Sequence, residues 1–123
     1  MSSHVGSDFY NKQKEFAYLQ SFLLRRNLNE VFCSDYILNI VLCSQPHKET
    51  DEIMLLTFSG VKDLKIGDLG GLVRLFIHVL DIADGQMEGI TYKVSEEENG
   101  LFSFYCKEVE YEITEFMRTD ALN

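Results

Sequence analysis

The strongest constraint on the fold is an alternation of apolar and polar side chains that recurs between residues 32 and 113. In VFCSDYILNIVLC the even positions from Phe32 to Leu42 are largely apolar, whereas Asp35 and Asn39 occupy odd positions. A period of two is typical of a β-strand with one buried face. Because the pattern returns after each turn-forming stretch, the sequence predicts a mainly antiparallel β-sheet of about five to six strands.

Two segments in the middle of the chain also predict strands of this sheet. A third segment fits either a helix or a strand. EIMLLTF, residues 52–58, is apolar on both faces and predicts an interior strand, with Gly60 marking a bulge or bend after it. ITYKV, residues 90–94, predicts a short strand. Residues 69–82 fit an amphipathic helix or a strand, and two glycines and several β-branched residues favour the strand.

The N-terminal region has a different period. Residues 7–26 predict a helix, because their apolar side chains recur at helical spacing. The stripe consists of Phe9, Phe16, Leu19, Phe22 and Leu23. The expected fold is therefore α+β, with an N-terminal helix packed on the sheet. The length of 123 residues suits a single domain over residues 1–123, with residues 1–6 expected to be disordered.

The balance of charge restricts the class of partner. Eleven Lys and Arg against 20 Asp and Glu give a net charge of −9, which disfavours direct binding to nucleic acid or to an anionic membrane. A cationic partner suits this charge better. The N-terminus lacks the pattern of a secretory signal, and no stretch approaches the roughly 20 apolar residues that cross a bilayer, so we expect a cytoplasmic protein.

The acidic residues gather near the C-terminus. The turn SEEENG precedes the strand LFSFYCKEVEYEI, in which alternate residues are glutamates. Alternate side chains share one strand face about 6.6 Å apart, and ionised carboxylates cannot face a dry core, so this half of the strand is expected to run past the core or along an edge. The predicted partner-binding residues are Glu96, Glu97, Glu98, Tyr105, Glu108, Glu110, Tyr111 and Glu112.

Chemical motifs are few. Alternate glutamates have a spacing that paired catalytic carboxylates also use, but such pairs arise in any strand with two alternating acidic residues. Cys33, Cys43 and Cys106 are far apart, without a partner His at ligand spacing, and are interpreted as buried thiols. The sequence therefore predicts no catalytic residue, no metal site and no cofactor.

One family resemblance points to a function. The runs LTFSGVKDLKIGDLGGLVRLFIHVLDI and QMEGITYKVSEEENGLFSFYCKEVEYEI lie within residues 32–113. This region resembles small bacterial immunity proteins of contact-dependent and polymorphic toxin systems. The resemblance implies an acidic cytoplasmic protein that binds a basic cognate toxin, possibly a nuclease, without catalysis. The alternatives are an acidic type III secretion chaperone that binds an effector and, third, a small enzyme.

Overall fold

The structure, a computed structural model, describes residues 6–26, 35–45, 52–69, 74–82 and 90–115. Within these residues the chain forms one helix and seven strands. The elements are α1 (Ser7–Gln13), β1 (Tyr18–Arg26), β2 (Tyr36–Cys43), β3 (Glu52–Ile66), β4 (Ile77–Asp81), β5 (Tyr92–Glu96), β6 (Phe102–Cys106) and β7 (Glu108–Glu115). The predicted class, an N-terminal helix on a mainly antiparallel sheet, is confirmed, with one or two more strands than expected.

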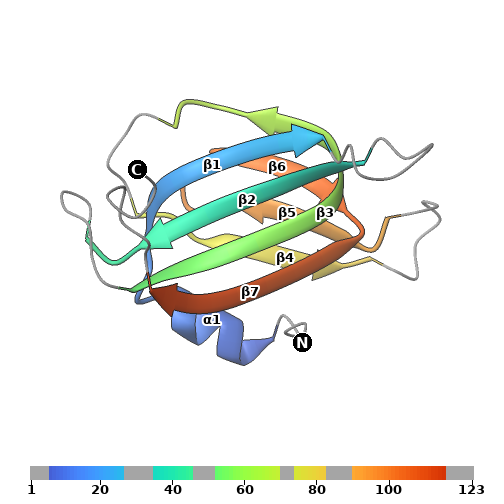
Figure 1. The fold of residues 1–123 in the computed structure, drawn as a ribbon. Helices are drawn as coiled ribbons and strands as arrows, with labels where there is room; N and C mark the ends of the chain where they lie inside the picture. Colours follow the sequence, from blue (N-terminus) through green and yellow to red (C-terminus); the bar gives the residue numbers. More distant parts are fainter. Residues whose placement is uncertain (1–5, 27–34, 46–51, 70–73, 83–89, 116–123) are drawn as a thin grey trace, which may run out of the picture.

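The seven strands form one antiparallel sheet that folds into two layers (Figure 1). The strand order is β1-β2-β3-β6-β5-β4, and β7 pairs with β3 on the side away from β2. The front layer holds β1, β2, the first half of β3 and β7, whereas the second half of β3 pairs with β6 in the back layer. Gly60, with φ of 69°, lies where β3 passes between the layers, so the predicted bend at this glycine is confirmed.

A second bend lies at Lys107, between β6 and β7. The Lys107 N–H donates to the Ser59 carbonyl (2.8 Å), and its ammonium pairs with the Asp35 carboxylate (3.0 Å). A Cβ added at Gly60 would lie 2.7 Å from the Lys107 side chain, so this crossing requires glycine. Lys107 also reverses the alternation, because Cys106 is buried and Glu108 is exposed. This reversal explains why the even positions turn from apolar to anionic.

The core lies between the two layers. Even-numbered residues from Leu38 to Leu42 in β2 and from Met54 to Phe58 in β3 pack in one buried cluster with residues of β4, β5 and β6, and Phe58 meets Phe104 edge to face at 4.9 Å. Cys43 and Cys106 are buried free thiols, and burial raises the pKa of Cys106 to about 12. Cys33 lies outside the described residues. The fully buried apolar side chains include Phe9, Leu38, Ile40, Leu42, Met54, Leu56, Phe58, Ile77 and Val94.

Helix α1 covers the open edge of β4. The Tyr10 hydroxyl donates to the Val79 carbonyl and accepts from the Val79 N–H, both at 3.1 Å. The buried Gln13 amide donates to the Ile77 carbonyl (3.0 Å) and accepts from the Ile77 N–H. Two side chains thus take the place of a neighbouring strand, and they satisfy backbone groups that would otherwise offer an edge for pairing.

The predicted extent of the helix, residues 7–26, is wrong. The helix ends at Gln13, and Tyr18–Arg26 forms β1, which pairs with β2. A register shift between Leu19 and Ser21 places an extra residue in the strand. Because of this bulge, Leu19 and Phe22 both pack against the core, and their spacing of three imitates a helix.

The preferred interpretation of residues 69–82 as a strand is confirmed for its second half. Ile77–Asp81 forms β4, in which Ile77 and Val79 are buried and His78 is half-buried between them. Residues 69, 74–76 and 82 belong to no helix or strand, and residues 70–73 lie outside the described residues.

Candidate functional site

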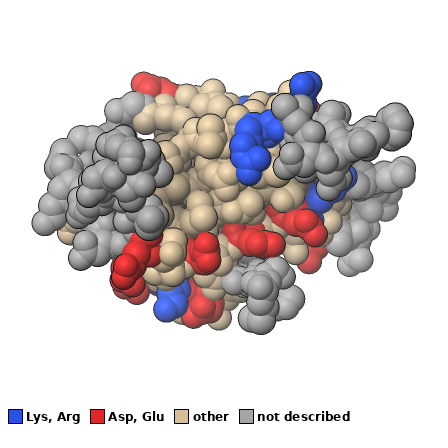
Figure 2. Space-filling view, viewed as in Figure 1, with Lys and Arg blue, Asp and Glu red and all other residues tan. Residues whose placement is uncertain are grey.

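Strand β7 carries a line of exposed carboxylates, as the alternation in the sequence predicts. Glu108, Glu110 and Glu112 are exposed and alternate with the buried Val109 and half-buried Tyr111. We name these three glutamates the acidic row. Among the described residues, strand β7 pairs only with β3, so the row lies on an edge strand, as expected from the sequence. Figure 2 shows acidic side chains in a band along this border of the front layer.

The charge of the acidic row is not neutralised by the part of the chain that the structure describes. Among these residues no ion pair or hydrogen bond joins Glu108, Glu110 or Glu112 to a cationic side chain. The adjacent cation, Lys107, is bonded to Asp35. Three like charges about 6.6 Å apart therefore face the solvent together, which costs energy through mutual repulsion that a cationic partner would remove.

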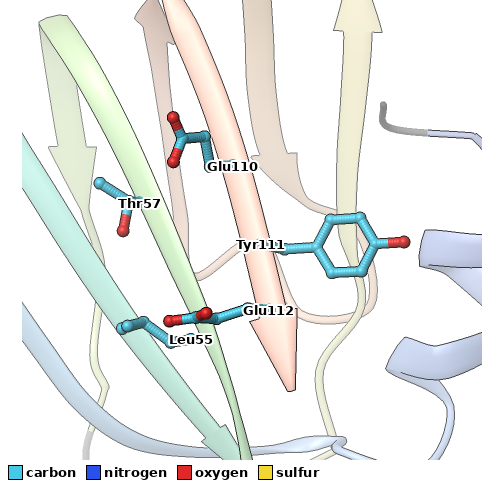
Figure 3. A pocket seen from close by; sticks show the side chains of 5 residues that line it. All are labelled: Leu55, Thr57, Glu110, Tyr111 and Glu112. Carbon is cyan, nitrogen blue, oxygen red and sulfur yellow. The ribbon is translucent and has the colours of Figure 1, made fainter. Parts of the chain in front are cut away.

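A shallow hollow lies beside the row. Its volume is about 160 Å³, and it is lined by Leu55, Thr57, Glu110, Tyr111 and Glu112. Figure 3 shows Glu110 and Glu112 projecting to the same side as Thr57 and Leu55, with Tyr111 projecting to the opposite side, toward α1. The hollow is smaller than the roughly 300 Å³ of a typical small-molecule pocket. Its size therefore suits one side chain of a partner protein better than a small-molecule ligand.

Tyr111 is not part of the exposed row. Its hydroxyl donates to the Asp8 carboxylate (2.9 Å), and its ring lies 5.0 Å from that of Phe9. Partial burial and the neighbouring Asp8 carboxylate raise the pKa of the Tyr111 phenol. This side chain anchors the N-terminal helix on β7, so the structure separates it from the glutamates with which the sequence grouped it.

Tyr105 lies on the outward side of the back layer. Its cross-strand neighbours are Lys62 and Lys93, and the Lys93 ammonium lies 5.9 Å from the centre of its ring. The surroundings of Tyr105 are therefore basic. The bend at Lys107 separates this residue from the acidic row, because the strand changes layers there.

Glu96 is buried, and the prediction that it belongs to an exposed surface is wrong. Only 2% of the residue is exposed. Its carboxylate accepts four backbone hydrogen bonds, from Phe76 (3.0 Å), Glu98 (2.8 Å), Asn99 (2.8 Å) and Leu101 (3.1 Å). Burial by itself raises the pKa of this carboxyl, but the four N–H donors outweigh it and lower the pKa below its ordinary value.

A signal in the sequence separates Glu96 from its neighbours. Tyr92, Val94 and Glu96 share one strand face, and Val94 is fully buried. The alternation therefore indicates that Glu96 points inward, whereas Glu97 and Glu98 continue into the turn. A buried carboxylate requires several donors, and a tight turn supplies them from its own backbone.

Glu97 and Glu98 are exposed in the turn between β5 and β6, and we name them the acidic turn. The turn lies at one end of β6, and Lys107 follows the other end. The whole length of β6 therefore separates the acidic turn from the acidic row. The structure forms two acidic groups, one in each layer.

Within the described ranges, no three His, Cys, Asp or Glu side chains are arranged to hold a metal ion. The same residues contain no helix with the length and apolar character needed to cross a membrane.

Fold and surface together define a small β-rich protein with a charged edge strand. A family model described as Immunity protein PIM8 matches residues 4–112. The chain belongs to this immunity protein family, and the resemblance found in the sequence is confirmed. Searches of curated proteins and of solved structures give no significant match. Membership of an immunity protein family implies a cognate toxin as the partner.

Proposed function

We propose that this protein neutralises its cognate toxin by binding alone, and that the acidic row contacts a cationic surface of the toxin. The observation that carries the proposal is the common direction of Glu108, Glu110 and Glu112 on an edge strand, without a cation opposite them among the described residues. The net charge of −9 adds a long-range attraction. No bond is made or broken in this mechanism.

The hollow beside the row suits a long cationic side chain. The half-buried Leu55 offers an apolar surface for the aliphatic stem of a lysine or arginine. Glu110 and Glu112 flank the hollow and accept hydrogen bonds from the charged end of that side chain (Figure 3). A cation held in this way also relieves the repulsion between the two carboxylates.

A nuclease is the toxin class that this charge fits best. An enzyme that acts on nucleic acid presents cationic residues to the phosphates of its substrate. An acidic inhibitor is steered to the same surface and covers it. The proposal therefore includes binding in the cytoplasm, where such a toxin meets its substrate, and it includes no direct contact with nucleic acid or membrane. Membership of an immunity protein family favours toxin neutralisation over the secretion-chaperone and enzyme alternatives.

The test compares two charge reversals of equal size. The double variant Glu110→Lys/Glu112→Lys alters the acidic row, and Glu97→Lys/Glu98→Lys alters the acidic turn. Both replace two carboxylates with two ammonium groups, so their net charges are equal. The partner is the cognate toxin domain, and the assay measures association rates by surface plasmon resonance at low and physiological salt.

We expect the row variant to slow association by at least about tenfold at low salt, with a smaller effect at physiological salt. The turn variant should slow association less, because its charges act only at long range. Growth of cells that express the toxin should fail with the row variant and continue with the turn variant. Equal effects of the two variants would remove the special role of the row, and unchanged binding by both would contradict the electrostatic mechanism.

A further inference from the structure

The outward face of the front layer is unusually apolar for a sheet exposed to solvent. Antiparallel sheets with one solvated face normally place polar residues there. On β2 and β3 the outward side chains include Ile37, Val41 and Leu55, and on β1 they include Leu23, which is 55% exposed. We name these four residues the apolar face. Figure 2 shows a field without Lys, Arg, Asp or Glu above the acidic band.

The four residues are neighbours. Val41 and Leu55 are directly paired across β2 and β3. Leu23 is paired with Asn39, which lies between Ile37 and Val41 on the same side of β2. On the side away from Val41, Leu55 is paired with Glu112 of β7. The apolar face is therefore continuous with the acidic row, and both point to the same side of the sheet.

The polar residues within this region are already partly satisfied. The Asn39 amide donates to the Thr57 hydroxyl at 3.1 Å, and these two residues are paired across β2 and β3. Covering them with a partner therefore costs less desolvation energy than covering two unpaired polar groups. Arg25 also points outward, from β1, at the border of this face that lies opposite the acidic row.

A stable interface buries about 800 Å² on each partner and involves about 20–30 residues a side. Three glutamates on one strand are too few to supply such an area. Interfaces have a core depleted in charge and a polar rim. The apolar face has the composition of a core, and the acidic row has the composition and position of a rim.

We infer that the apolar face of β1, β2 and β3 is the core of the toxin contact, with the acidic row as its rim on one side. This inference rests on the proposed function and extends it. The partner surface is then an apolar patch flanked by Lys or Arg where it meets β7. Rim charges act mainly on association, whereas contacts in the core act mainly on dissociation.

The test separates these two rates. The variant Leu23→Ser/Val41→Ser removes apolar area from the face without changing charge, and neither residue lines the hollow beside the acidic row. Its control is Ile66→Ser/Leu80→Ser, which alters two side chains, each 49% exposed, away from the face. The same toxin domain is used. We expect the first variant to dissociate at least about tenfold faster with an association rate within about twofold of the parent, and the control to change neither rate.

The outcomes distinguish failure of this inference from failure of the proposed function. If the serine variant dissociates at the parental rate while the row variant still associates slowly, the contact is confined to the acidic row and the hollow beside it, and only the inference is overturned. If the row variant is also unchanged, the proposed function is overturned as well. Light scattering of the protein alone is a further measurement, and a dimer that the serine variant dissociates would assign the apolar face to self-association. Circular dichroism verifies folding, and the single variant Leu23→Ser replaces the pair if the double variant unfolds.

Discussion

Replacement of Glu96 by glutamine changes one atom of a buried side chain and should destabilise the fold strongly. Each carboxylate oxygen accepts two backbone N–H groups, with Oε2 serving Phe76 and Glu98 and Oε1 serving Asn99 and Leu101. Glutamine retains a single acceptor oxygen. Its NH₂ group therefore faces two donors, and the remaining two hydrogen bonds lose the negative charge that strengthens them.

The magnitude follows from these bonds. A hydrogen bond to a charged group contributes about 1.5–3 kcal/mol, so the loss of two amounts to about 3–6 kcal/mol. Water that reaches the exposed turn forms hydrogen bonds that recover part of this loss. The expected decrease in the free energy of unfolding is therefore about 2–4 kcal/mol. That is a large share of the roughly 5–15 kcal/mol by which native proteins are stable. The melting temperature should fall by roughly 8–16 °C, since a domain of this size loses about 4 °C per kcal/mol.

Urea denaturation at pH 7 measures the effect as a change in the free energy of unfolding. The matched control is Glu98→Gln, the same chemical change on an exposed side chain in the same turn. This control should lie within about 0.5 kcal/mol of the parent, as most surface substitutions do. If Glu96→Gln also lies within that range, the carboxylate does not hold the turn, and the reasoning is refuted.

The pH dependence of stability has a defined sign. The pKa of Glu96 is lower in the folded protein than its ordinary value of 4.5. The ionised form is therefore favoured by folding, and its contribution is fully present above pH 4.5 and is lost as pH falls through the folded pKa. The difference in stability between the parent and Glu96→Gln should be constant from pH 7 to about pH 5 and shrink at lower pH. A difference that grows on acidification would contradict the direction of this pKa shift.

Two further predictions concern the frame that holds the site. Gln13→Ala removes both side-chain hydrogen bonds to the edge of β4 and should lower the free energy of unfolding by about 2–4 kcal/mol, whereas Asn11→Ala on the exposed side of α1 should change it little. Gly60→Ala combines positive φ with close approach to Lys107 and should cost about 2–3 kcal/mol. Gly100→Ala has similar φ but nothing within 4 Å of the added carbon, so it should cost only about 1–2 kcal/mol. Equal losses at the two glycines would show that the contact with Lys107 has no effect on stability.

The N-terminal region shows where reasoning from local pattern fails. Leu19 and Phe22 have the spacing of a helix, yet both belong to β1, because a bulge adds a residue between them. The partner that fixes β1 is β2, the next strand along the chain. Pairing between the two strands therefore overrides a local periodicity that fits a helix equally well.

For the C-terminal strand residues, local alternation is likewise correct in part. Alternation correctly indicated that Glu108, Glu110 and Glu112 share one exposed side, because each strand residue points opposite to the next. It also puts Tyr105 and Tyr111, which have the same parity, on the side opposite the glutamates. This holds for Tyr111, which faces inward, but not for Tyr105, which faces outward in the other layer. The reversal at Lys107 separates them, and it depends on contacts with Ser59 and Asp35.

The sequence by itself determined the β-rich class, the turn SEEENG, the bend at Gly60 and the common direction of the acidic row, because each follows from neighbours along the chain. Only the tertiary structure decided that Phe76 adds a distant donor to Glu96, that α1 closes the edge of β4, and that the apolar face adjoins the acidic row. The physical reason is that burial and cross-strand neighbours depend on which distant segments pair, and the strand order brings together segments that the chain keeps apart.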